Sequence, residues 1–384
     1  MTNDQIKSAV AYFEQLLLSQ VERAEKLNQP KTSKANGATV IGIIDGDGIG
    51  PIIMNEARRA LKAVLKDEIA NGTVILKDIE GLTIENRLAL GKSVPDDTMA
   101  AIKTCDVLLK GPTTTPSGGL ADKKNTGNGA MESANVSLRR ALDLYANTRP
   151  VVVPEEGIDW MFFRENTEGE YTLGSKGIEL EGLMTMDFKV TTIAGTRRIA
   201  RAAYEYARKN GKKRVSIITK SNIMKKTDGM FSKIAHEVAA EYPEIETDEY
   251  YIDIMTANLV NKAIRNQFQV FLLPNLYGDI ITDEAAQIQG GVGTAGSSNV
   301  GDQYAMFEAI HGSAPRLIEM GLGDYANPES ILTAACMLLD HIGLQSKAAQ
   351  LRAAMAKAHA AAAVTGDRDG ATCAAYGDAL IANL

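Results

Sequence analysis

Apolar and polar residues recur along the chain with two periods, one typical of strands and one typical of helices. Short β-branched or aliphatic runs predict strands at residues 39–44, 107–109, 215–219 and 270–273. Apolar residues spaced by three or four predict helices, namely the segments 53–65, 197–210, 230–241, 256–266 and 348–363. This alternation predicts an α/β fold with a largely parallel sheet that helices cover on both faces.

The first 36 residues form an extension ahead of this pattern. Apolar residues recur there at helical spacing and predict an amphipathic helix, with its apolar stripe at Ile6, Val10, Phe13, Leu17 and Val21. Acidic residues interrupt the segment, so it does not resemble a signal peptide. We interpret residues 1–36 as a helical extension and linker, serving as a packing or oligomerisation arm.

Glycine-rich segments mark the expected loops. The sequence GDGIG at 46–50 directly follows the strand 39–44 and predicts a tight turn into a helix. It is not GxGxxG, and no acidic residue ends a second strand ~20 residues further on, so we infer no Rossmann nucleotide site from it. The segments 120–130 and 290–302 are rich in glycine and polar residues and predict loops.

Composition limits the class of protein. The 384 residues, 45% of them hydrophobic, allow two α/β units, and no apolar run approaches the length of a membrane span. A net charge of −7 argues against a nucleic-acid or anionic-membrane partner. The three cysteines form no CxxC pair, which argues against a thiolate zinc site and favours a reducing compartment, so we expect a cytoplasmic protein.

Three acidic residues are candidate metal ligands. Asp279 and Asp283 are four residues apart after the strand 270–273, and on a helix this spacing places both carboxylates on one face. Two such charges repel each other unless a cation lies between them, and Mg²⁺ or Mn²⁺ prefers oxygen ligands. Asp253 is the third candidate. The alternative is that these acids cap helices or lie in solvent.

A group of polar and basic residues is a candidate anion site. Ser133, Asn135 and Arg139 lie close together in the sequence, and Arg149 and Arg164 follow further on. Guanidinium groups bind carboxylates bidentately, so several of them in an acidic protein predict recognition of a polycarboxylate. The alternative for each arginine is a surface ion pair.

Tyr171 and Lys220 are the candidates for proton transfer. Lys220 ends the strand 215–219, where α/β proteins place functional groups. Burial near a metal would disfavour its charged form and let it accept a proton near neutral pH. A tyrosine close by could deliver one. The alternatives are a surface lysine and a core tyrosine.

Ordered motifs from residue 39 to the end of the chain resemble those of the isocitrate/isopropylmalate dehydrogenase family of β-decarboxylating dehydrogenases. The motifs are GDGIGP (46–51), KGPTTTP (110–116), SANVSLRR (133–140), LDLYANTRP (142–150), FRENTEGEY (163–171), TKSNIMKKTDGMF (219–231), PNLYGDIITDEAA (274–286) and FEAIHGSAP (307–315). Their number and order identify the chain as a member of this family.

The resemblance implies a two-domain architecture with a non-Rossmann dinucleotide site. The large cofactor-binding domain would comprise residues 37–144 together with 290–384. The small domain would comprise residues 145–289 and carry the dimer interface, with a clasp-like segment around 169–190. It also implies a homodimer in which Lys220 and Asp253 enter the partner's cleft.

The resemblance further implies the reaction, which is oxidation and decarboxylation of a 2-hydroxy tricarboxylic acid, as in the tricarboxylic acid cycle. Asp253, Asp279 and Asp283 would hold Mg²⁺ or Mn²⁺, Lys220 would take the hydroxyl proton, and Tyr171 would protonate the enolate. Ser133, Asn135 and the three arginines would bind the substrate carboxylates.

Substrate choice depends on Ser133 and Asn135. Isopropylmalate enzymes are leucine-rich at this place, whereas polar side chains suit a γ-carboxylate, so isocitrate fits best. Homoisocitrate, isopropylmalate and tartrate-type substrates are alternatives within the family. A non-catalytic regulatory subunit is an alternative of another class, although such paralogues usually lose metal or base residues, which survive here.

The resemblance implies a set of cofactor-binding residues, which are Thr115, Asn222, Glu308, His311, Gly312, Ser313, Ala314, Arg316, Asn327 and Asp367. NAD enzymes of the family usually carry an aspartate after HGSAP, and many NADP enzymes carry Lys-Tyr. This chain has Arg316-Leu317. Arg316 suits the 2′-phosphate of NADP, which we favour, and NAD is the alternative.

Overall fold

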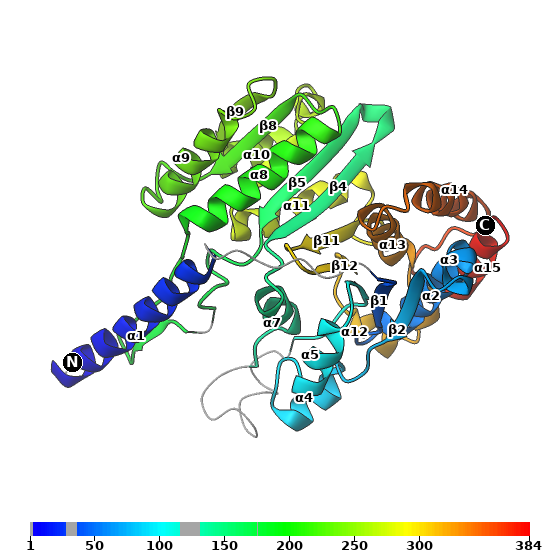
Figure 1. Ribbon diagram of the computed structural model, residues 1–384, viewed down its shortest axis with the longest axis horizontal. Coiled ribbons are helices and arrows are strands. Elements are labelled where there is room, and N and C mark those ends of the chain that lie inside the picture. Colours follow the sequence, from blue (N-terminus) through cyan, green and yellow to red (C-terminus); the bar gives the residue numbers. More distant parts are fainter. Residues whose placement is uncertain (1–2, 28–36, 116–130, 175) are drawn as a thin grey trace. The chain divides into compact units, whose positions relative to one another are not determined.

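The computed structural model describes residues 3–27, 37–115, 131–174 and 176–384 (Figure 1). Its strands are β1 Thr39–Ile44, β2 Val74–Asp78, β3 Val107–Lys110, β4 Ala146–Val153, β5 Ile158–Glu165, β6 Ile178–Leu180, β7 Met184–Met186, β8 Arg214–Thr219, β9 Glu246–Tyr251, β10 Val270–Leu273, β11 Gly296–Val300 and β12 Ala305–Ala309. Its helices are α1 Asn3–Leu27, α2 Gly50–Val64, α3 Lys66–Ala70, α4 Ile84–Leu90, α5 Asp96–Lys103, α7 Ala134–Ala141, α8 Ile193–Lys209, α9 Thr227–Ala239, α10 Ile252–Val260, α11 Asn275–Gln289, α12 Pro315–Glu319, α13 Glu329–His341, α14 Gln345–Ala361 and α15 Cys373–Ile381.

The chain divides into two compact units. Unit 1 contains the N-terminal residues up to 32 and residues 145–147 and 152–285. Unit 2 contains residues 33–144, 148–151 and 286–384, so β4 contributes residues to both units. The functional domain boundaries that the resemblance implies remain a prediction.

Unit 2 is built on a mixed sheet. Strands β1, β2, β3 and β12 pair in parallel in the order β2-β1-β3-β12, and β11 pairs antiparallel with β12. Every residue of β3 is buried, as expected of a central parallel strand. The helices α2, α13, α14 and α15 pack around a large apolar core that includes Ile41, Ile53, Phe307 and Leu338.

Unit 1 is built on a parallel sheet in the order β5-β10-β8-β9. Helix α8 packs on β5, β10 and β8, and α9 packs on β8, as Figure 1 shows. The hydroxyl of Thr192 caps α8 by accepting from the Gly195 amide at 3.0 Å. Ile199, Tyr204 and Ile217 belong to the buried core between these helices and the sheet.

The predicted α/β class is confirmed, and two local predictions are wrong. The segment 290–302 was expected to be a loop, but it contains β11, which is buried because it pairs with β12 and lies beneath α13. The predicted helix 256–266 is displaced, because α10 ends at Val260 and a short 3₁₀ segment, Arg265–Gln267, follows. The predicted loop 120–130 lies outside the described residues.

Helix α1 confirms the predicted N-terminal helix but exposes its apolar stripe. Ile6, Val10, Phe13, Leu17 and Val21 are exposed, and Leu16 is the buried residue of the helix. Phe13 contacts Phe188 with ring centroids 5.3 Å apart. Among the described helices, α1 included, none is long and apolar enough to cross a bilayer.

Candidate functional site

The candidate groups of unit 1 lie at the carboxyl ends of its parallel strands. Arg164 is near the end of β5, Lys220 follows β8, and Asn275 follows β10 at the start of α11. Strands that run in parallel bring these ends to one edge of the sheet, which is where α/β proteins bind ligands. The sheet therefore places residues from distant parts of the sequence along one edge.

Asp279 is the centre of a hydrogen-bonded group at this edge. Tyr171 Oη donates to Asp279 Oδ2 at 2.6 Å, and Arg164 Nη1 donates to Asp279 Oδ1. The Arg164 guanidinium also lies over the Tyr171 ring, 5.3 Å from its centroid, and its Nε donates to Asn275 Oδ1 at 2.8 Å. The structure thus brings together Arg164, Tyr171 and Asp279, which the sequence proposed for three different roles.

Gly278 allows Arg164 to approach α11. A Cβ at position 278 would lie 2.6 Å from Cγ and 2.7 Å from Cβ of Arg164. Contacts that short are not tolerated, and the atoms involved belong to the inner part of the arginine side chain, which cannot easily move. The absence of a side chain at 278 is therefore what lets the arginine stem pass beside the helix and reach Asp279.

Lys220 and Asp253 form an ion pair, with Lys220 Nζ 2.5 Å from Asp253 Oδ1. The hydrogen bond from Lys220 lowers the pKa of the Asp253 carboxyl below its usual range. The Lys220 amide donates to the buried carboxylate of Asp228 at 2.7 Å, which fixes the backbone of the lysine. The exposed Asp253 carboxylate and its lysine therefore stand at the surface of unit 1 as a pair.

The acidic residues fit a divalent cation only in part. Asp279 and Asp283 both lie on α11, one turn apart, as their spacing predicts; Asp279 is half-buried and Asp283 is exposed. Within the described ranges, no group of three His, Cys, Asp or Glu side chains could hold a metal ion. Two carboxylates are a fitting but incomplete oxygen set for Mg²⁺ or Mn²⁺, so further oxygens would have to come from elsewhere.

Unit 2 contains a buried group of charges around Glu308. Lys110 Nζ lies 3.1 Å from Glu308 Oε2, and Arg139 Nη2 donates to Glu308 Oε1 at 3.0 Å. Asn299 Nδ2 donates to the same oxygen at 2.9 Å. The pairing of β3 with β12 sets Lys110 directly opposite Glu308. Arg139 and Glu308, proposed for substrate and cofactor respectively, are therefore partners here.

Opposing effects act on these buried groups. Burial alone would raise the pKa of Glu308, but the charges of Lys110 and Arg139 outweigh it and lower that pKa to about 2. Burial lowers the pKa of Lys110, and the Glu308 carboxylate counteracts part of that change. Glu308 is thus an ionised carboxylate inside the core of unit 2.

The glycine turn joins three loops. A Cβ at Gly46 would lie 2.1 Å from the Pro112 carbonyl oxygen, and one at Gly48 would lie 2.1 Å from that of Ser313. Both glycines have positive φ. The buried Asp47 carboxylate accepts from the amides of Ile84 and Thr114, each at 2.7 Å. The turn therefore has a structural role, which is to hold the loops that follow β2, β3 and β12.

The loop after β12 begins with the predicted cofactor residues. The Ser313 hydroxyl lies 2.7 Å from that of Thr114, and burial lowers the pKa of His311. Ala314 takes a left-handed conformation with a φ of 44° directly before α12. Gly312, which lies between His311 and Ser313, is exposed. The exposed Arg316 lies in the first turn of that helix.

The remaining cofactor candidates are scattered. Thr115 and Asp367 are exposed in unit 2, and Asn222 is exposed in unit 1. Asn327 Oδ1 accepts from the Glu329 amide at 2.9 Å, so it shapes the start of α13. Within unit 2, no hydrogen bond between described residues links Thr115, Asn327 or Asp367 directly to the His311 loop.

The substrate candidates of unit 2 lie at the start of α7 and on β4. Ser133 stands at the N-cap position of α7, and Asn135 Oδ1 accepts from the Thr113 hydroxyl at 3.0 Å. Arg139 is buried on the same helix, one turn further on. Arg149 is buried on β4.

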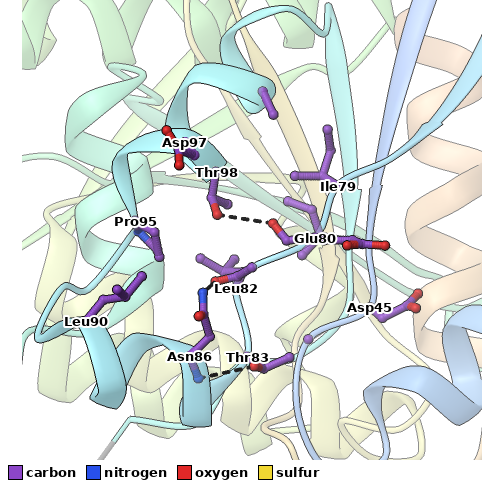
Figure 2. Close-up of a pocket in the computed structure, with 14 residues that line it drawn as sticks. Asp45, Ile79, Glu80, Leu82, Thr83, Asn86, Leu90, Pro95, Asp97 and Thr98 are labelled. Carbon is purple, nitrogen blue, oxygen red and sulfur yellow. Dashed lines mark hydrogen bonds between the residues drawn. The ribbon is translucent and has the colours of Figure 1, made fainter.

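Unit 2 also contains a cavity of about 760 Å³ outside this group (Figure 2). It lies at the ends of β1 and β2, and Asp45, Glu80 and Asp97 are its acidic lining residues, with Leu82 and Leu90 among the apolar ones. None of the predicted site residues lines it. An acidic lining does not suit a tricarboxylate, so this cavity is not the candidate substrate site.

Sequence and structure comparisons agree on the relationships of the chain. A sequence model of the family described as isocitrate/isopropylmalate dehydrogenase matches residues 40–380. The chain belongs to this family. The match covers both units of the structure, so every site residue predicted above lies within it.

Several relatives are named isocitrate dehydrogenase. The chain is 39% identical to the NADP enzyme of Rickettsia prowazekii over 314 residues, which are 79% of this chain and 60% of that protein. It is 36% identical to the mitochondrial NAD enzyme subunit 2 of Schizosaccharomyces pombe, covering 84% of this chain and 80% of that one. The chain thus spans about 60% of the length of the Rickettsia relatives.

A solved structure supports the isocitrate dehydrogenase-like fold. The crystal structure of isocitrate dehydrogenase from Methylococcus capsulatus superimposes with a TM-score of 0.77 at 32% identity, covering 90% of this chain and 99% of that one. A homoisocitrate dehydrogenase of Methanocaldococcus jannaschii is 34% identical over 82% of this chain and 88% of its own length.

Three residues that support the site were not predicted from the sequence. Asp47, Arg87 and Lys110 are buried and polar, and they connect the loops that carry the predicted site residues. Arg87 donates twice to the Thr114 carbonyl, at 3.0 Å each. Asp47 and Lys110 lie within the family motifs given above, so those motifs could have identified the two residues. Arg87 lies outside the motifs.

Proposed function

We propose that this protein is an isocitrate dehydrogenase that converts isocitrate to 2-oxoglutarate and CO₂ and reduces NADP or NAD. The observation that carries the proposal is the polar start of α7, where Asn135 pairs with Thr113 beside the buried Arg139. An isopropyl group would offer no acceptor to the amide nitrogen of Asn135 or the guanidinium of Arg139, whereas a γ-carboxylate would. The relatives named isocitrate dehydrogenase support the same conclusion.

The arginines bind and orient the substrate in this proposal. Arg139, Arg149 and Arg164 are all buried, and the guanidinium fork binds carboxylates in pairs of hydrogen bonds. Arg164 is already fixed by Asn275 and Asp279, so it would present its charge without a further loss of side-chain entropy. Ser133 completes the proposed set.

Two residues move protons. Lys220, whose backbone is fixed by Asp228, takes the proton from the substrate hydroxyl, directly or through water. Tyr171 returns a proton to the carbon that loses CO₂, and its hydrogen bond to Asp279 orients its hydroxyl group. Asp279 and Asp283, with Asp253, would hold Mg²⁺ or Mn²⁺, which supplies positive charge to stabilise the negative charge that develops on oxygen.

A homodimer completes the acidic set. Asp253 is exposed and pairs with Lys220 rather than with the two acids of α11. In this proposal Lys220 and Asp253 of one copy enter the cleft of the other, in the way that the family resemblance implies. Each cleft would then contain three acids and one lysine from two copies of the chain.

The cofactor proposal rests on Arg316. Its guanidinium is exposed in the first turn of α12, where it can reach a 2′-phosphate. We therefore favour NADP, with NAD as the second candidate because relatives of both kinds exist. Thr115, Asn222, Asn327 and Asp367 would complete the dinucleotide site together with the His311–Ala314 loop.

The cysteines support a reducing compartment. None of Cys105, Cys336 and Cys373 forms a disulfide, and all three are buried. Secreted proteins use cysteines mainly in disulfides, whereas cytosolic ones keep them reduced. We therefore propose a cytoplasmic location.

The test is an absorbance assay of the purified chain with isocitrate and Mn²⁺, run with NADP and with NAD. We expect reduced cofactor to form with isocitrate, faster with NADP, and chelation of the metal to abolish it. Homoisocitrate is the second candidate substrate, because one relative carries that name. Turnover of homoisocitrate or isopropylmalate but not of isocitrate would overturn the proposal, as would full activity in excess chelator.

A further inference from the structure

Lys110 is a fully buried lysine at the end of β3 that the reaction does not use directly. Its Nζ donates to Glu308 at 3.1 Å and to the Gly111 carbonyl at 3.0 Å. The facing Glu308 carboxylate favours the charged ammonium form of Lys110. A buried charge is costly unless it is paired, and Glu308 and the Gly111 carbonyl offset that cost here.

The buried group carries an excess of positive charge. Lys110 and Arg139 bring two positive charges and Glu308 brings one negative charge, which leaves one positive charge. Without Lys110, the Glu308–Arg139 pair would be neutral. The lysine therefore decides whether Arg139 presents a net charge to an anion.

Arg139 also has unused hydrogen-bonding capacity. Its Nη2 is held by Glu308, but its buried Nε has no hydrogen-bond partner among the described residues. A buried donor without an acceptor is destabilising, and a bound carboxylate would relieve that cost. The arginine is thus held at one end by Glu308 and incompletely bonded at the other.

We propose that Lys110 is a positioning residue for substrate binding: it offsets the charge of Glu308, so that Glu308 fixes Arg139 without neutralising it. The inference rests on the proposed function, because it takes Arg139 as a ligand of a substrate carboxylate. Lys110 touches neither substrate nor cofactor in this scheme and acts only through Glu308 and Arg139.

A packing role for Lys110 makes a different prediction. If its alkyl chain and hydrogen bonds only stabilise the core, loss of the ammonium group lowers stability and leaves the KM for isocitrate unchanged. If its charge matters, removing the negative charge of Glu308 in the same chain restores the balance. The double variant therefore separates the two roles.

The experiment compares K110M, E308Q and the double variant K110M/E308Q with the wild type, with K103M as the control at an exposed lysine of the same unit. Each is assayed for kcat and KM of isocitrate at saturating NADP and for isocitrate binding by calorimetry. Methionine keeps most of the lysine volume, and glutamine keeps an oxygen for Arg139. Thermal melting checks that each variant is folded.

We expect K110M to raise the KM and Kd for isocitrate at least about tenfold, while kcat changes less. K110M/E308Q should regain most of the lost affinity, because its group again carries one positive charge. If K110M does not fold, the double variant alone tests the inference. Its affinity for isocitrate should then be within about threefold of that of the wild type. K103M should behave as the wild type.

Unchanged affinity in K110M, or a double variant that binds no better than K110M, would overturn the inference. If K110M does not fold, an isocitrate affinity of the double variant about tenfold or more below that of the wild type would overturn the inference. These outcomes differ from failure of the proposed function, in which the wild type itself does not turn over isocitrate.

Discussion

Gly278 lets a buried arginine approach the helix that carries Asp279. A methyl group at this position would lie 2.6 Å from Arg164 Cγ, so the arginine would have to leave its place beside Asn275 and Asp279. We expect Gly278→Ala to destabilise the protein by about 1–3 kcal/mol. We also expect kcat/KM to fall about tenfold or more, because Arg164 loses its orientation. Thermal melting and steady-state assays measure the two effects.

Gly229 provides the matched control for that substitution. It lies within α9 of the same unit, and a Cβ there would meet nothing within 4 Å. Alanine in a helix interior is more favourable than glycine by roughly 0.5–1 kcal/mol, so Gly229→Ala should melt at the same or a higher temperature. Equal melting temperatures and activities for the 278 and 229 variants would contradict the steric argument.

Single residues were predictable where motif and geometry coincide. The i, i+4 spacing of Asp279 and Asp283 predicted their common helix, and both lie on α11. Lys110 was not predictable as a buried residue, because a lysine at a strand end is usually exposed. Its burial depends on Glu308, which lies 198 positions away in the sequence. The pairing of β3 with β12 is a long-range contact, which local sequence patterns do not predict.

At the scale of elements, the four apolar runs predicted as strands do form strands, whereas the polar strand β11 was not predicted. Strands β1 and β10 have the predicted limits because each is a short, mainly apolar run. The sequence GSSNV of β11 has the composition of a loop. It forms a strand because β12 offers a partner, and Gly296 fits tightly against α13, where a Cβ would lie 2.6 Å from the Ala334 amide nitrogen.

The last residue of β5, Glu165, has a carboxyl group with a strongly shifted pKa. Burial and then the nearby Glu168 raise the pKa of Glu165 to about 7, despite hydrogen bonds from the hydroxyl and amide of Thr167. The folded protein therefore retains a proton that the unfolded chain has already released. Stability is lowered progressively as pH rises from about 4.5 to about 7.

Glu165→Gln removes that titration. Glutamine is neutral at both ends of this range. Relative to the wild type, the free energy of unfolding of the variant should therefore increase between pH 5 and pH 7.5, by up to about 3 kcal/mol. Urea denaturation at the two pH values measures the difference. Glu244→Gln alters an exposed carboxylate of the same unit and is the control. A gap between wild type and Glu165→Gln that stays constant with pH would exclude the proposed shift.

At the scale of the whole molecule, the proposed active site needs two copies of the chain. Unit 1 exposes the Lys220–Asp253 pair, and among its described residues Asp253 forms no three-residue metal group with Asp279 and Asp283, so neither set is complete alone. In a twofold dimer that exchanges the pair, each site contains Lys220 and Asp253 of one copy and the α11 acids of the other. The arrangement therefore determines which inactive variants can complement each other.

Asp253→Asn and Asp279→Asn should each abolish turnover, but their mixture should recover it. In a mixed dimer one site collects both substitutions and the other collects neither, so the purified mixed dimer should have about half of wild-type activity. Co-expression with two affinity tags, followed by assay of the doubly purified species, measures this. A mixture of Lys220→Met and Asp253→Asn is the control. Both residues enter the same partner site, so each site of that mixed dimer keeps one substitution and stays inactive. No recovery in the first mixture would show that the pair acts within its own subunit. Recovery in the control would show that Lys220 and Asp253 serve different sites.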